Sequence, residues 1–140
     1  IAYHTAINNS IVIGMDKEKV KIIMGDPDSV ENYTVFEEEI WKYDESRIGF
    51  KKDIVKGWQN KSNNLPVYMG DKVEGAVFKT GSSKDEVVRA MGTPDSISKR
   101  YNEEEIWVYK NSTVTFNKYG YVKEWDDASK NLSVDKGNKH

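Results

Sequence analysis

The sequence predicts an α+β fold: a tandem repeat of two short helices packed on a four-stranded antiparallel β-meander, with the two sheets joined into one concave sheet. Three observations support this class. Residues 14–67 recur recognisably at 81–134, each copy begins with a short helical pattern closed by Gly and Pro, and each then changes to alternation. A period near 67 residues is too long for a solenoid and therefore indicates two copies of one small domain.

The two copies correspond in three motifs, at 14–20 with 81–87, 24–29 with 91–96 and 37–43 with 103–109. The sequence offset is 67, falls to 66 through the Trp-x-Tyr motif and returns to 67 before Trp125. One deletion and one insertion, both in turn-like stretches, therefore separate the copies. We assign the first repeat to residues 1–67 and the second to 68–140.

Composition restricts the class of protein. The chain has 140 residues, of which 37% are hydrophobic and 31% charged, with a mean hydropathy of −0.75 and no cysteine. No apolar run is long enough to span a membrane, and disulfides and thiol chemistry are excluded. The net charge of −2 disfavours nucleic-acid binding, which needs a concentrated basic face. Each copy alone would bury a marginal core, so we expect the two to pack together.

Each copy should open with a short amphipathic helix. Ser83 and Glu86 have the spacing of a capping box, and Asp16 is the expected N-cap of the first copy. A glycine suits the left-handed position after each helix, and a proline two residues later blocks its continuation; these glycines are Gly25 and Gly92. A second, weaker helical turn is expected ahead of each helix, over 2–9 and 72–78.

Four antiparallel strands should follow in each copy. The expected ranges are 29–34, 38–43, 46–51 and 54–59, then 96–101, 104–110, 112–117 and 120–126. Aromatic residues alternate on one strand face and are expected in the core; they are Trp41, Tyr43, Trp107 and Tyr109. On the last strand, alternation separates a valine from a tryptophan (Val55 from Trp58, Val122 from Trp125), so only one of the two should face the helix.

Several kinds of catalytic or metal site lack their residues. The only histidines, His4 and His140, stand at opposite ends of the chain, and there is no cysteine. A zinc site and a nucleophile activated by histidine are therefore not expected. Neither a calcium loop nor a glycine-rich phosphate loop is present, so we expect no metal and no cofactor.

The acidic runs 37–39 and 103–105 have two interpretations. They could supply a carboxylate pair for glycoside hydrolysis. The favoured interpretation is that they are solvated strand beginnings which keep a hairpin edge from pairing with other chains.

The open face of the sheet is the candidate binding site. Large aromatic residues interleaved with lysine are typical of a protein-binding hot spot. The candidate protein-binding residues are Trp58, Trp125, Tyr121, Lys56, Lys123, Thr115 and Lys42. We expect both tryptophans to be partly accessible on the face opposite the helices; the alternative is that they pack one copy against the other.

The first copy carries the pattern Gly-Met-x-x-x-x-Val-x-x-x-x-Gly-x-Pro at 14–27, then Trp-x-Tyr, a strand ending in Phe and a closing Val-Lys-x-Trp. This pattern resembles the SmpA/OmlA (BamE) family of envelope lipoproteins. Its tandem occurrence is more similar to the β-lactamase-inhibitor-protein (BLIP)-like family. That resemblance covers most of both copies and implies a concave surface that grips a β-lactamase, with a last-strand tryptophan in the contact. By position this residue is Trp125, and by internal symmetry Trp58.

Together these points predict a non-catalytic, extracytoplasmic protein-binding module, secreted or anchored to the cell envelope. The expected partner is another protein, either an envelope protein or a secreted enzyme, and not a nucleic acid or a metal. We interpret the start at Ile1 as that of a processed chain, so that membrane contact would come only from an N-terminal lipid anchor. The alternatives are a β-lactamase-inhibitor-like protein and a small carboxylate-dependent hydrolase.

Overall fold

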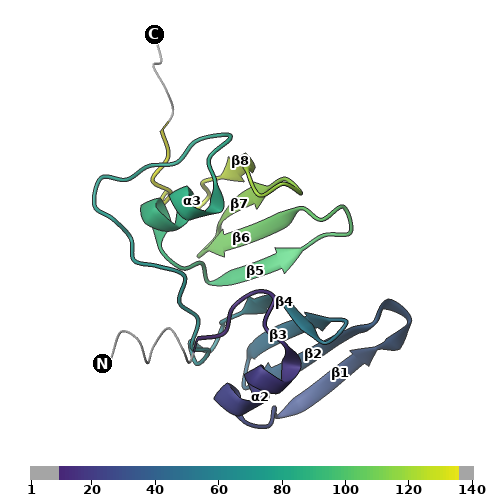
Figure 1. Cartoon of the computed structure of the whole chain (residues 1–140). Coiled ribbons are helices and arrows are strands. Elements are labelled where there is room, and N and C mark those ends of the chain that lie inside the picture. The colour runs from purple at the N-terminus through teal and green to yellow at the C-terminus, as the bar shows by residue number, and fades with distance from the viewer. Residues whose placement is uncertain (1–9, 136–140) are drawn as a thin grey trace. The chain divides into compact units, whose positions relative to one another are not determined.

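The computed structural model describes residues 10–135 and divides the chain into two compact units, Ile1–Tyr68 and Met69–His140, here unit 1 and unit 2. Each unit has a short helix over a four-stranded meander (Figure 1). Unit 1 contains α2 (Lys17–Met24), β1 (Ser29–Tyr33), the 3-10 turn η1 (Thr34–Phe36), β2 (Glu38–Tyr43), β3 (Ser46–Lys51) and β4 (Ile54–Gln59). Unit 2 contains α3 (Lys84–Met91), β5 (Ser96–Lys99), β6 (Glu105–Tyr109), β7 (Ser112–Phe116) and β8 (Val122–Asp126).

The predicted fold class is wrong in detail, although the structure is α+β. The strands belong to one eight-stranded sheet in the order β1 to β8, rather than to two four-stranded sheets joined into a concave one. The helix expected at 72–78 is not formed. Instead, the Val73 N–H donates to the Arg89 carbonyl at 2.7 Å and the Met69 N–H to Thr93 Oγ1 at 2.9 Å, so this segment's backbone bonds to the end of α3. The turn expected at 2–9 lies outside the described residues.

The helix boundaries agree with the predicted capping residues. Asp16 accepts a hydrogen bond from the Lys19 N–H at 2.8 Å. The capping box of α3 is complete, since Ser83 and Glu86 each accept a hydrogen bond from the other's N–H. Both helices end at a glycine with positive φ (79° and 80°), which a residue with a Cβ adopts at a cost.

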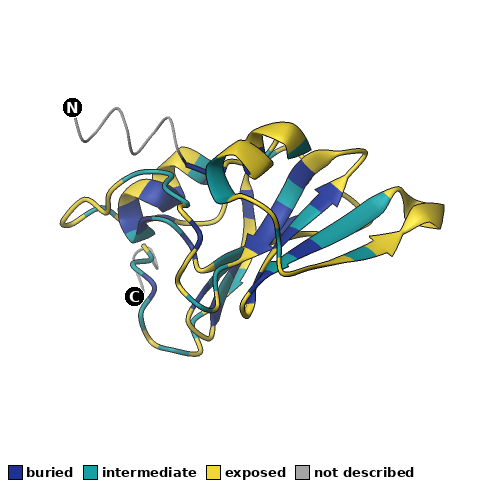
Figure 2. Ribbon diagram, turned by 90° about the horizontal axis from the view of Figure 1, so that it is seen from below, coloured by how far each residue is buried: buried dark blue, intermediate teal, exposed yellow. Residues whose placement is uncertain are grey.

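The core of each unit lies between its helix and one face of its strands (Figure 2). The aromatic residues predicted for the core are all buried there: Trp41, Tyr43, Trp107 and Tyr109. In unit 1 the ring of Trp41 lies 4.8 Å from that of Phe50, and in unit 2 the ring of Trp107 lies 4.6 Å from that of Phe116. These aromatic contacts therefore recur at corresponding positions.

A β-bulge in β4 decides which side chains of unit 1 reach this core. Phe50 of β3 faces Val55, and Ile48 faces Trp58, so β4 uses one more residue than β3 between the two pairs. Lys56 is that extra residue. Because a bulge resets the alternation, Val55 and Trp58 point to the same face and are only 1% and 2% exposed. The predictions that only one of them faces the helix and that Trp58 is accessible are therefore wrong.

The same bulge recurs in β8 of unit 2. Phe116 faces Val122 and Val114 faces Trp125, which leaves Lys123 as the extra residue. Trp125 thus also lies on the helix-facing side, against the prediction, and its ring meets that of Phe78 edge-on at 5.6 Å. Unlike Trp58, it is half-buried.

A segment after the last strand completes each unit, and it is not among the elements predicted from the sequence. Its pattern, Asn/Asp-x-Ser-x-Asn-Leu-x-Val, occupies 60–67 and 127–134. The side chain of the first residue in this pattern accepts a hydrogen bond from the leucine N–H, Asn60 from Leu65 at 2.9 Å and Asp127 from Leu132 at 3.0 Å. Its last residue bridges to the chain ahead of the helix in both units.

Candidate functional site

The last glutamates of the two acidic runs, Glu39 and Glu105, are built into the core rather than solvated. Trp41 Nε1 donates to Glu39 at 2.9 Å, and Trp107 Nε1 donates to Glu105 at 2.7 Å. A lysine at the start of each helix completes the contact, with Lys17 2.8 Å from Glu39 and Lys84 3.1 Å from Glu105. The Glu-x-Trp spacing places both side chains on one strand face, and this was the available sequence signal. The prediction of solvated acids is wrong at these positions.

The charge state of Glu39 follows from these contacts. Desolvation favours the neutral acid, but hydrogen bonds from Lys17 and Trp41 outweigh it, so the pKa of Glu39 lies below its usual value. A general acid for glycoside hydrolysis needs the opposite shift. Glu39 is therefore suited to a fixed anion that joins helix and sheet.

On the opposite face, the extra residue of each bulge forms an ion pair across the neighbouring strand. Lys56 reaches Glu38 at 2.8 Å, and its stem passes over Gly49 of β3. Lys123 reaches Glu104 at 2.8 Å. Glu104 precedes β6 and Lys123 lies in β8, so this stem passes over β7. Two lysines predicted to bind a partner thus brace their own sheet.

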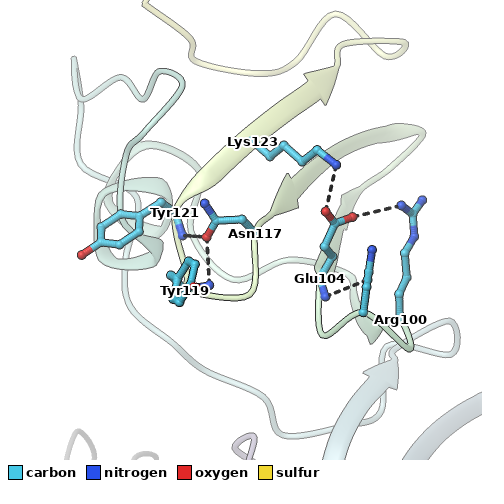
Figure 3. Close-up of polar contacts among 7 residues, drawn as sticks. Arg100, Glu104, Asn117, Tyr119, Tyr121 and Lys123 are labelled. Carbon is cyan, nitrogen blue, oxygen red and sulfur yellow. Dashed lines mark hydrogen bonds and ion pairs between the residues drawn. The ribbon is translucent and has the colours of Figure 1, made fainter.

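Glu104 joins the β5–β6 loop of unit 2 to strand β8 (Figure 3). Besides Lys123, it contacts Arg100 Nη1 at 3.4 Å, and its N–H donates to Asn102 Oδ1 at 3.1 Å. The hydrogen bond from Lys123, which outweighs the cost of burial, holds the pKa of Glu104 below its usual value. The β5–β6 loop is therefore tied to the start of β8, the strand that follows the β7–β8 turn.

The β7–β8 turn is held by Asn117. Its Oδ1 accepts the N–H of Tyr119 at 2.9 Å and that of Tyr121 at 3.1 Å, as Figure 3 shows. The Asn117 N–H donates to the Tyr121 carbonyl at 2.8 Å, and Gly120 has a φ of 90°. A turn with this many internal bonds presents its side chains in a defined position.

Three exposed tyrosines stand on these two loops. Tyr101 is 86% exposed, Tyr119 73% and Tyr121 50%, and we call them the tyrosine surface. Lys99, Glu105, Phe116 and Val122 face one another along the sheet, so both loops leave the same end of unit 2. Because neighbouring strands are about 4.8 Å apart, the two loops leave the sheet within a few strand spacings of each other.

Unit 1 differs from unit 2 at this end of its strands. Its β1–β2 connection is one residue longer and exposes Val35 (88%) and Phe36 (50%), whereas its β3–β4 turn is one residue shorter. The added residue of the β7–β8 turn brings Tyr119. Both length differences between the repeats fall here. They are the sequence signal for Tyr101 and Tyr119, neither of which is among the predicted binding residues.

The predicted binding residues are divided between the two units. Trp58, Lys56 and Lys42 belong to unit 1, whereas Trp125, Tyr121, Lys123 and Thr115 belong to unit 2. Within unit 2, Thr115 lies on the strand that Lys123 crosses and is 6% exposed. Only Tyr121 is both strongly exposed and outside an ion pair given by the structure. Lys42 is half-buried on β2.

Two general features can be stated for residues 10–135. No group of three or more His, Asp or Glu side chains within them is placed to hold a metal ion. None of the helices in this range is long and apolar enough to cross a membrane.

Comparison with known proteins identifies a similar fold. No protein-family model matches the chain, and no curated protein matches it in sequence. It is similar to the crystal structure, at 1.40 Å, of a protein from Streptococcus mutans described as a candidate β-lactamase inhibitor. The TM-score is 0.52 at 17% identity, over 89% of this chain and 93% of that one. This likeness concerns the fold and agrees with the inhibitor-like resemblance; the resemblance to the SmpA/OmlA (BamE) family stays a prediction.

Proposed function

We propose that this chain is a non-catalytic protein-binding module that acts outside the cytoplasm, and that its contact surface is the tyrosine surface of unit 2. The observation that carries the proposal is the exposure of Tyr101, Tyr119 and Tyr121 on two loops at the same end of unit 2, of which the β5–β6 loop is joined to β8 by Glu104. Tyrosine combines a large apolar ring with a hydroxyl and few rotatable bonds, so it contributes much to protein contacts at a small entropic cost.

The sequence favoured the open face of the sheet as the binding site, but neither of the two predicted tryptophans lies on that face. The bulges turn Trp58 and Trp125 to the helix side. Lys56 and Lys123 neutralise glutamates of their own sheet. An ion pair of this kind has less to offer an incoming partner, because its charges are already satisfied.

The paired-carboxylate hydrolase is not supported by the same geometry. Glu104, which precedes β6, and Glu105, the first residue of β6, contact different partners. Glu105 bonds to Trp107 and Lys84, while Glu104 bonds to Lys123 and Arg100. Each carboxylate is thus held by cations or an indole rather than by another carboxylate.

A capture experiment tests the proposal. The wild-type chain is immobilised and exposed to the envelope fraction of cells that make it, beside the double variant Tyr119→Ala/Tyr121→Ala and the control Tyr33→Ala, an exposed tyrosine of unit 1. We expect the double variant to bind its captured partner at least about 30-fold more weakly, the loss typical of a hot spot. Its unfolding free energy should change by less than about 1 kcal/mol because both side chains are exposed. Equal capture by the wild type and the double variant would contradict the assigned surface.

A second candidate is a β-lactamase-inhibitor-like protein, favoured by the structural similarity over 89% of the chain. The test is hydrolysis of a chromogenic β-lactam by a panel of class A β-lactamases with increasing amounts of the chain. A saturable loss of rate with one enzyme would support this narrower function. Unchanged rates across the panel would remove it and leave the protein-binding proposal standing.

The extracytoplasmic location rests on the resemblance alone. Fractionation of the source cells with an antibody to this chain tests it directly. Recovery in the cytoplasmic fraction would contradict it.

A further inference from the structure

The tyrosine surface differs in charge from the rest of the chain. Residues 99–103 and 118–121, all exposed except Gly120, contain three bases (Lys99, Arg100, Lys118) and one acid (Glu103), a net charge of +2. The whole chain carries −2. Lys123 and Glu104 do not alter the balance, because they offset each other in their 2.8 Å ion pair.

The corresponding end of unit 1 lacks this excess of positive charge. Its exposed residues 33–37 and 51–54 contain two bases (Lys51, Lys52) and two acids (Glu37, Asp53), a net charge of zero. Its exposed side chains are also more aliphatic, with Val35 and Ile54 among them. The combination of tyrosine and positive charge therefore belongs to unit 2.

The contacts within the loops show how this charge is presented. Lys118 Nζ lies 5.3 Å from the ring centre of Tyr119, within the range of a cation–π contact. Arg100 touches Glu104 at 3.4 Å, and about half of its side chain stays exposed. Lys118 is thus held beside a tyrosine ring, Arg100 is held by Glu104, and both cations remain open to a further acceptor.

We propose that the tyrosine surface binds an exposed acidic segment of a partner protein; this inference rests on the proposed protein-binding function. Tyrosine hydroxyls and the two cations can donate to carboxylates, while the rings pack on the segment's apolar atoms. Opposite charge would speed association and select partners. A nucleic acid fits less well, because three exposed bases make a small basic area.

The test uses three synthetic peptides of equal length on one apolar sequence, in which four variable positions are all Glu, all Gln or all Lys. Each is titrated into the full ¹⁵N-labelled chain, and the amide signals of the loops at 100–103 and 118–121 are followed. We expect the affinity of the Glu peptide, obtained from these signal shifts, to be at least about fivefold higher than that of the Gln peptide. Its affinity should fall when salt rises from about 0.05 M to 0.3 M. The Lys peptide should not bind.

Charge reversal provides the matched variants. Lys118→Glu should weaken binding of the Glu peptide at least about fivefold. Lys110→Glu, at the β6–β7 turn on the opposite end of unit 2, should leave this binding unchanged. Amide spectra of both variants that match the wild type away from the substituted turn establish that each is folded.

The outcomes separate the two proposals. Equal binding of the Gln and Glu peptides at these loops would overturn the acidic specificity and keep the tyrosine surface as a protein-binding site. No shift at the loops with any peptide, together with unchanged capture in the tyrosine variants, would remove both. Binding of single-stranded DNA at these loops more tightly than the Glu peptide would overturn the assignment to an acidic protein segment.

Discussion

The two units make the same internal contacts but differ at their surfaces. In each, a Trp indole and a helix lysine converge on one glutamate, and a tyrosine hydroxyl donates to the carbonyl of the glycine that ends the helix, at 2.9 Å in both. In each unit, the lysine of the bulge also forms a 2.8 Å ion pair with the glutamate one position before that glutamate (Lys56 with Glu38, Lys123 with Glu104). Contacts present twice account for folding, because both units need them.

The differences are of two kinds. Unit 2 is the more deeply buried: the Glu105 side chain is 5% exposed against 18% for Glu39, and three residues of α3 are buried against one of α2. Unit 2 also has the longer β7–β8 turn with its exposed tyrosines. Recognition is therefore best sought where the units differ.

The largest expected effect is common to both units. Phe50→Ala and Phe116→Ala should each lower the free energy of unfolding by about 3–5 kcal/mol, since both rings are fully buried against a tryptophan. Denaturant melts of the two variants measure it. A loss below about 1 kcal/mol for either variant would mean that the two cores are not equivalent.

The last-strand tryptophans should separate the units. Trp58→Ala should cost about 3–4 kcal/mol because Trp58 is 2% exposed, and Trp125→Ala about 1–2 kcal/mol because part of its ring is exposed. The same melts check both values. Trp58→Phe is the control: Trp58 Nε1 has no hydrogen-bond partner in the described part of the chain, so the loss of the indole N–H should add no penalty. A cost below about 1 kcal/mol for Trp58→Ala would place this ring on the surface.

A smaller difference is expected for the core glutamates. Glu105→Ala leaves the Trp107 N–H without its acceptor and should cost about 2 kcal/mol. Glu39→Ala should cost about 1 kcal/mol, because water can reach the more exposed Glu39 site. The comparison is between the losses in unfolding free energy of Glu105→Ala and Glu39→Ala, both at neutral pH. A larger loss for Glu39→Ala would contradict the deeper burial of unit 2.

The smallest effect appears only at alkaline pH. Burial, followed by the charges of Asp26 and Asp28, raises the pKa of Tyr43 to about 12, and deeper burial also raises that of Tyr109. Because the folded-state pKa values are raised, the stability from these neutral phenols is complete below the unfolded value near 10 and is lost as pH rises through the folded values. Ultraviolet titration of Tyr43→Phe and Tyr109→Phe against the wild type should assign a step near pH 12 to Tyr43. A step from Tyr43 near pH 10 would contradict this.

Local signals predicted the helix caps and strand ranges, but not the single eight-stranded sheet. Helix caps and strand ranges depend on neighbouring residues, so the capping box at 83–86 and the strand 38–43 could be read directly. The bulges at Lys56 and Lys123 could not, because strict alternation assumes one residue on each strand per ladder step. That single assumption misplaced Trp58 and Trp125.

The candidate site was missed for related reasons. A run of three glutamates has the composition of a solvated strand end, and only the partners Trp107 and Lys84 show that Glu105 is buried. Tyr119 stands in a turn that sequence patterns treat as a connection. Its exposure depends on the fold of the turn around Asn117.

The most direct test of the central claim, that the bulges turn both last-strand tryptophans to the helix side and leave recognition to the loops, needs no variant in the measured sample. A soluble gadolinium chelate broadens ¹⁵N–¹H signals in proportion to their accessibility, and each of the four Trp residues gives one indole signal, assigned with Trp→Phe variants. The account predicts that Trp58 Nε1–H is protected as well as Trp107 Nε1–H, while the amides of Tyr101 and Tyr119 broaden early. A Trp58 indole signal that broadens together with those loop amides would contradict it.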